Sequence, residues 1–201
     1  MKRLLLLSGL LLLPDVVSAQ TVVFSARDAA VFEAILQQTF RPEAAARLHL
    51  PADSVAVAPV HLFAQTLAVY SPEGPHSMGS IGERTISRSK HELGRLLDAK
   101  VAEELVSALV TSNAVSIEIP DGALAGTVLV AEEDLPAPTE LASRHSLNLA
   151  ALSRPGYSED GHAVVYATYV CGALCGYTGL FLLFEEEAGW RVQSFTLFGM
   201  S

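Results

Sequence analysis

The stretch AVVYATYVCGALCG, residues 163–176, is the part of the sequence that most strongly indicates the fold. From Ala163 to Val170 the residues are apolar or aromatic at both odd and even positions, with Thr168 as the exception. Successive side chains of a strand point to opposite faces of the sheet, so this run predicts a strand that is buried on both faces. We expect this strand at the centre of a sheet, with helices packed over each side.

Cys171 and Cys175, the only two cysteines of the chain, follow this run. In a straight strand two residues four apart lie about 13 Å from each other, which is too far for a disulfide bond. Gly172 and Gly176 allow the chain to bend between the cysteines. Because two cysteines of a short chain usually pair in an oxidising compartment, we expect a local disulfide across the connection between two central strands. A disulfide bond that closes so small a loop should stabilise the fold by less than about 3 kcal/mol, which is the value estimated for a loop of about 15 residues.

Other chemistries of paired cysteines lack a partner in this sequence. A thioredoxin-type redox site needs Cys-x-x-Cys at the start of a helix, and c-type haem attachment needs Cys-x-x-Cys-His. A binuclear copper loop would need a histidine and a methionine where the chain has Gly179 and Leu182. A mononuclear copper site formed by Cys171, Cys175 and His162 is the remaining metal alternative. We expect no metal and no cofactor.

The amino terminus has the pattern of an export signal. Lys2 and Arg3 precede an apolar run, Leu4 to Leu13, and Val17-Ser18-Ala19 supplies the small residues that a signal peptidase prefers. The apolar run is too short for a membrane span, which takes about 20 residues. We therefore expect residues 1–19 to be a cleaved signal peptide and the protein to be periplasmic or secreted.

The remaining chain, residues 20–201, has the size of a single domain that buries a real core. The whole chain carries a formal net charge of −9. Lys2, Arg3 and Asp15 give the signal a net +1, so the mature chain carries −10. This balance repels nucleic-acid phosphates and anionic lipid, so we expect neither nucleic acid nor a membrane as a partner after signal cleavage.

Two amphipathic helices and several strands are expected along the chain. Ser25 followed by Asp28 resembles a capping box, and the apolar spacing after it predicts a helix that ends at Arg41-Pro42. A second helix is expected within Ser89 to Ser112. Together these patterns predict an α+β domain: a largely antiparallel, twisted sheet with a C-terminal strand meander, packed by two amphipathic helices. The strands are expected at residues 54–58, 65–70, 115–119, 127–131, 149–153, 163–170, 180–186 and 191–198.

Several short motifs beyond residue 151 occur together in a recognisable order. They are Leu152-Ser153-Arg154, Gly156-Tyr157, Ala163-Val164-Val165-Tyr166, the segment from Cys171 to Gly176, Leu182-Leu183 and Gly189-Trp190-Arg191-Val192. This pattern resembles a family of exported bacterial proteins of uncharacterised function. The resemblance implies a bacterial exported domain and no particular activity. The last two strands are also similar to nuclear-transport-factor-2-like cones, which is a likeness of fold alone.

Two classes of function follow from these observations. The favoured one is a non-catalytic exported module, for binding or for structure, stabilised by one local disulfide bond. Such a module would contact an unknown ligand or protein partner through the sheet or the loop around Tyr177, with His162 as a second candidate contact. The alternative is an enzyme whose site is assembled from scattered residues, such as His145, His162 and Glu185. No residue is assigned a catalytic role, because the nucleophile and metal motifs that parts of the sequence resemble are all incomplete.

Overall fold

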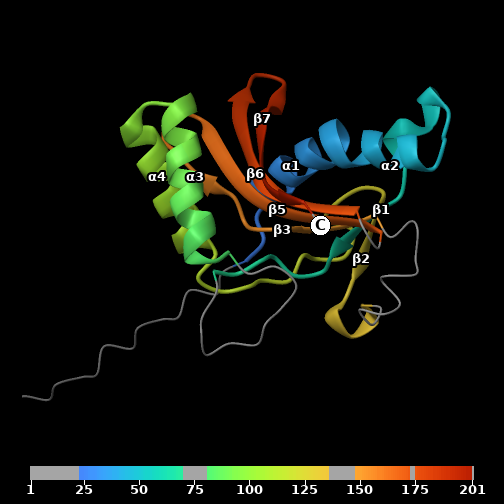
Figure 1. Ribbon diagram of the computed structural model, residues 1–201. Helices are drawn as coiled ribbons and strands as arrows, with labels where there is room; N and C mark the ends of the chain where they lie inside the picture. The colour runs from blue at the N-terminus through green and yellow to red at the C-terminus, as the bar shows by residue number, and fades with distance from the viewer. Residues whose placement is uncertain (1–22, 70–80, 136–147, 173–174, 201) are drawn as a thin grey trace, which may run out of the picture.

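Figure 1 shows the computed structural model of the chain, in which residues 23–69, 81–135, 148–172 and 175–200 are described. The predicted signal peptide, residues 1–19, lies outside the described residues, and its assignment stays a prediction. Within the described ranges, no helix is long and apolar enough to cross a membrane.

The strands form one seven-stranded sheet. They are β1 (Val60–Phe63), β2 (Thr127–Val130), β3 (Leu149–Leu152), β4 (Gly156–Tyr157), β5 (His162–Gly172), β6 (Cys175–Glu186) and β7 (Gly189–Met200). Their order is β2-β1-β3-β5-β6-β7, and the short β4 also pairs with β5. β1 pairs in parallel with β2 and β3, whereas the other pairs are antiparallel. The predicted α+β fold with a C-terminal meander is confirmed.

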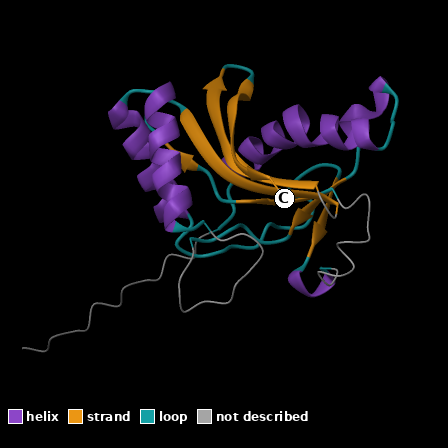
Figure 2. Cartoon of the chain, in the orientation of Figure 1, coloured by secondary structure: helices purple, strands orange, loops and turns teal. Residues whose placement is uncertain are grey.

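Helices cover both faces of the sheet (Figures 1 and 2). Val165 and Phe181 point into the core under the amino-terminal helices, and Val164 and Leu182 point into the core under the other pair. β5 is thus buried on both faces at the centre of the sheet, as its sequence predicts. The first face carries α1 (Ala26–Ile35), a π-helical turn (Leu36–Phe40) and α2 (Arg41–Arg47), and the second carries α3 (Glu83–Leu96) and α4 (Ala99–Ser112).

The first helix begins at the predicted capping box but does not end where expected. The Ser25 hydroxyl accepts from the Asp28 N–H at 3.0 Å, and the Ser25 N–H donates to the Asp28 carboxylate at 3.1 Å. The predicted end at Arg41-Pro42 is wrong, because the chain stays helical through both residues. The N–H of Arg41 bonds to the carbonyl of Leu36 across the wider π-helical turn. Pro42 then lies in the first turn of α2, the part of a helix where proline is best tolerated.

The predicted second helix is two helices. The break lies at Leu97, whose backbone is extended at φ −130° and ψ 169°. Asp98 then caps α4 by accepting from the Lys100 N–H at 2.9 Å. The apolar stripe continues across the break, so spacing alone does not reveal it.

Some of the expected strands are not strands of the sheet. Residues 54–58 lie mostly in a 3₁₀ helix (Ala52–Val57), and 65–70 and 115–119 make only isolated bridges in their described parts. β1 was not predicted at its true position. Short windows rich in Val and Leu show β propensity but not which segment finds a neighbour to pair with. The other expected strands are confirmed as β2, β3, β5, β6 and β7.

β7 forms one edge of the described sheet, and two side chains cover part of this edge. The Gln38 amide donates to the Trp190 carbonyl at 3.1 Å and accepts from the Val192 N–H at 3.0 Å, as a neighbouring strand would. Arg88 donates to two carbonyl oxygens near the other end of β7, at 2.6 and 3.3 Å. The register of β7 also shifts twice against β6. Such bulges and covering groups protect an edge from pairing with another chain.

Candidate functional site

The cysteine pair lies at the end of the β5–β6 hairpin and forms the predicted disulfide bond. Its Cα atoms are 5.1 Å apart, because the strand register shifts after Val170 and Gly172 pairs with Cys175. The side chain of Cys171 belongs to the core that α1 and α2 cover. The bond therefore fixes the hairpin end against this core.

Tyr177 is a half-buried residue of β6 in a closed ring of five aromatic side chains. Neighbouring ring centroids lie 4.5 to 5.8 Å apart. The Tyr177 hydroxyl donates to a carboxylate oxygen of Glu43 at 2.8 Å, which links the hairpin to α2. The geometry therefore gives Tyr177 a packing role beside the disulfide. The ring consists of Phe40, Tyr169, Tyr177, Phe195 and Phe181.

His162 lies at the opposite end of the same two strands. Its Nδ1 is 3.0 Å from an Asp160 carboxylate oxygen, and its ring packs 5.0 Å from that of Phe184. The hydrogen bond from Ser158, followed by the contact with His162, lowers the pKa of Asp160 below its ordinary value. Tyr177 pairs with Tyr169, seven residues along β5 from His162, which is about 23 Å. The structure does not bring Tyr177 and His162 into one loop.

The residues of the two alternative sites are also separated. His162 pairs with Phe184, so its side chain and that of the next residue, Glu185, leave the sheet on opposite faces. Glu185 instead pairs with Arg27 of α1 at 2.7 Å. His145 lies outside the described residues. For the copper alternative, Cys171 is nine residues from His162 along β5, or about 30 Å. Over the described part of the chain, no group of three or more His, Cys, Asp or Glu residues could hold a metal ion.

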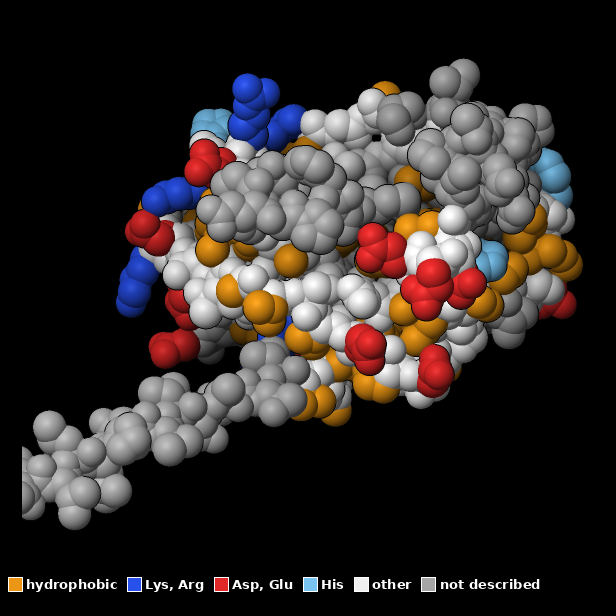
Figure 3. All heavy atoms as spheres, turned by 90° about the horizontal axis from the view of Figure 1, so that it is seen from below, with side chains coloured by type: hydrophobic (Ala, Val, Ile, Leu, Met, Phe, Trp, Pro, Cys, Tyr) orange, Lys and Arg blue, Asp and Glu red, His pale blue; other side chains and the backbone are white. Residues whose placement is uncertain are grey.

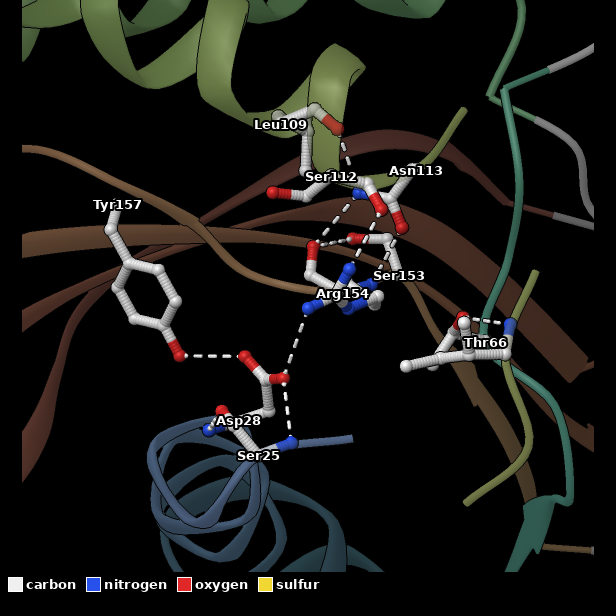
Figure 4. Close-up of polar contacts among 10 residues, drawn as sticks. Ser25, Asp28, Thr66, Leu109, Ser112, Asn113, Ser153, Arg154 and Tyr157 are labelled. Carbon is white, nitrogen blue, oxygen red and sulfur yellow. Dashed lines mark hydrogen bonds and ion pairs between the residues drawn. The ribbon is translucent and has the colours of Figure 1, made fainter. Parts of the chain in front are cut away.

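A buried polar network, which the sequence does not predict, joins α1 to the sheet (Figure 4). Asp28 is 1 % exposed, accepts from the Tyr157 hydroxyl at 2.9 Å and lies 3.4 Å from the Arg154 guanidinium. Burial, followed by the charge of Asp28 and the hydrogen bond to it, raises the pKa of Tyr157 well above its ordinary value. The phenol therefore stays protonated and serves as a donor to Asp28.

The same network continues to α4 through Asn113 (Figure 4). The buried Asn113 amide donates to the carbonyls of Leu109 and Arg154, at 2.7 and 2.9 Å, and accepts from the Arg154 N–H at 2.7 Å. The Arg154 guanidinium also donates to the Ser112 carbonyl at 3.3 Å. The contacts of Arg154 with Asp28, Asn113 and Ser112 join α1 to the end of α4, so the network acts as a structural clamp between the two helical layers.

An open groove lies beside the ends of β1 and β2 and has a volume of about 280 Å³. Ile119 and Leu129 give it an apolar floor. Four exposed carboxylates line it, and none of its described lining residues is Lys or Arg. On one face of the molecule, Figure 3 shows acidic side chains gathered among hydrophobic ones. The four carboxylates are Glu118, Asp121, Glu132 and Glu133.

The amino-acid sequence does not predict this groove. Asp121 looks like a turn residue, and Glu132 and Glu133 look like solvated charges after a strand. The parallel pairing of β1 with β2 brings the ends of these strands together, and the bridge between Gln65 and Glu118 adds the segment that carries Glu118 and Asp121. A run of acidic residues directly after a predicted strand is the one signal that the sequence offers.

Comparison of the chain with protein-family models, curated proteins and solved structures finds no match. The resemblance to exported bacterial proteins therefore stays a prediction.

Proposed function

We propose that this protein is an exported, non-catalytic binding module of the periplasm or the cell exterior, whose groove binds a positively charged ligand. The groove carries this proposal, because it combines an apolar floor with four exposed carboxylates. Charges of one sign that line a cleft raise the local concentration of oppositely charged ligands. The net charge of −10 expected for the mature chain acts in the same direction.

The volume of the groove favours a small ligand. Its volume of about 280 Å³ lies at the lower limit of small-molecule sites, which span about 300 to 1,000 Å³. A primary amine on an alkyl stem fits this chemistry. The stem can lie on Ile119 and Leu129 while the ammonium group contacts the carboxylates, as lysine side chains lie on apolar surfaces. The ligand class is therefore an alkylamine or a lysine side chain of a peptide.

Calorimetric titration with 1,5-diaminopentane at low and high salt tests this proposal. We expect saturable binding that weakens with salt, because exposed charge pairs are screened. The double variant Glu132→Gln/Glu133→Gln should weaken binding about tenfold. The control Glu83→Gln/Glu187→Gln removes the same charge away from the groove and should leave affinity within about twofold. Equal weakening by both variants would mean attraction by net charge alone and would contradict the proposal.

Export is tested by the mass and amino-terminal sequence of the protein recovered outside the cytoplasm. We expect the chain to begin at Gln20, and a chain that begins at Met1 would refute processing. The Cys171–Cys175 disulfide supports export, since such bonds persist in oxidising compartments. Treatment with a reductant should add the mass of two hydrogen atoms.

A further inference from the structure

Apart from the acidic groove, the molecule has a place where the positive charge of Arg27 lies against two aromatic rings. The guanidinium carbon of Arg27 lies 4.2 Å from the ring centroid of Tyr157 and 5.3 Å from that of Trp190. The two ring centroids are 5.8 Å apart, with 47° between the ring planes. The same guanidinium lies 2.7 Å from the carboxylate of Glu185. Tyr157, Trp190 and Glu185 thus form three walls, which we name the cation cage.

The two aromatic walls of the cation cage are held by contacts that do not involve Arg27. The Tyr157 hydroxyl donates to buried Asp28 at 2.9 Å, which fixes its ring. Trp190 is 8 % exposed, and its carbonyl accepts from Gln38. Glu185 lies directly opposite Trp190 in the β6–β7 pair. A site whose aromatic walls are already ordered needs little rearrangement to bind.

Arg27 is the least constrained member of this arrangement. Its side chain is 46 % exposed, so it can leave the cage without unpacking the core. It also lies in the first turn of α1, where the helix dipole disfavours a positive charge. The attraction of the Arg27 guanidinium to the two rings and to Glu185 therefore offsets its unfavourable interaction with the helix dipole. The same attraction acts on any guanidinium group that reaches the cage.

We propose that the cation cage is a binding site for the guanidinium group of arginine, which Arg27 fills in the absence of a ligand. The ring faces attract the delocalised cation, and Glu185 accepts a hydrogen bond from it. The ligand is free arginine or an arginine side chain of a partner peptide. This site shares none of its wall residues with the acidic groove, and it does not depend on the function proposed for the groove.

The fluorescence of Trp190 tests this site directly, because it is the only tryptophan of the chain. We expect arginine amide to change the emission of the wild type in a saturable way. Arg27→Ala removes the internal competitor and should tighten binding about fivefold. A Gly-Arg-Gly tripeptide distinguishes the two kinds of ligand. If the ligand is a peptide, the tripeptide should bind more tightly than arginine amide. If the ligand is free arginine, the tripeptide should bind no more tightly than arginine amide.

Two further variants separate cage binding from general attraction to an acidic protein. In the Arg27→Ala background, Glu185→Gln should weaken arginine amide binding about tenfold, whereas Glu187→Gln should leave it unchanged. Thermal unfolding of each variant checks that the fold persists. The proposal is overturned if Arg27→Ala shows no saturable response. It is equally overturned if the wild type shows no response at an arginine amide concentration ten times the dissociation constant measured for Arg27→Ala. Arg27 would then be a fixed structural contact.

Discussion

Replacing Gly156 by alanine should strongly destabilise the protein, because β4 lies directly against the backbone of α4. A Cβ atom at this position would lie 2.4 Å from the Leu109 nitrogen, 2.7 Å from the Leu109 Cα and 2.8 Å from the Leu105 carbonyl oxygen. These are backbone atoms, so no rotamer change relieves the overlap. Overpacking a core costs about 1–3 kcal/mol, and we expect the upper end here, about 3 kcal/mol of unfolding free energy.

Gly94 provides a matched control within α3. A Cβ atom there meets nothing within 4 Å. Alanine is favoured over glycine in a helix by about 1 kcal/mol, so Gly94→Ala should stabilise the protein. Thermal unfolding followed by circular dichroism measures both changes. For a chain of this size we expect Tm to fall by about 6–12 °C in Gly156→Ala and to rise by about 2–4 °C in Gly94→Ala.

The opposite signs make the comparison decisive. Urea unfolding should return the same two free-energy changes with an unchanged m-value, because both variants keep the same native fold. If Gly156→Ala unfolds within about 2 °C of the wild type, β4 does not pack against α4 as described, and the reasoning from this contact is refuted.

Three further substitutions test the core and the network. Asp28→Asn leaves the Arg154 guanidinium without its buried counter-charge and should lower the free energy of unfolding, measured in urea, by about 3 kcal/mol. An unchanged urea midpoint would show that this pair does not clamp the fold. Val165→Asp places a charge in a strand buried on both faces and should yield no folded protein by circular dichroism. A cooperative melt near that of the wild type would mean that β5 is not central. Cys171→Ser should lower stability by about 2 kcal/mol and leave the fold intact, so loss of all folded protein would contradict a local disulfide.

The sequence predicts the centre of the fold because burial leaves a direct mark on composition. Val164 and Val165 are adjacent, yet each is buried in a different core. An apolar run that ignores the two-residue period therefore indicates a strand covered on both sides. The capping box of α1 is predicted for a similar reason, since Ser25 and Asp28 interact within one turn of the chain.

Features that depend on distant segments could not be predicted. Asp28 and Arg154 are 126 positions apart, and neither residue indicates the other in the sequence. Pro42 indicates a helix end only when the preceding turn has α geometry. Here the preceding turn is π-helical, so the helix continues through Pro42. The groove is hidden for the same reason, because its carboxylates come from two segments that meet at the end of β1. One is placed there by the pairing of β1 with β2, and the other by the bridge between Gln65 and Glu118.

The covered edge of β7 has a consequence for how this protein behaves at high concentration. Gln38 and Arg88 close the edge with side chains, which exchange rotamers within nanoseconds, whereas a paired strand leaves only by local unfolding. The backbone groups of β7 that these two side chains cover are therefore exposed for short intervals while the molecule remains fully native. Polymerisation through this edge would start from the folded protein, and its rate would depend on two polar contacts and not on global stability.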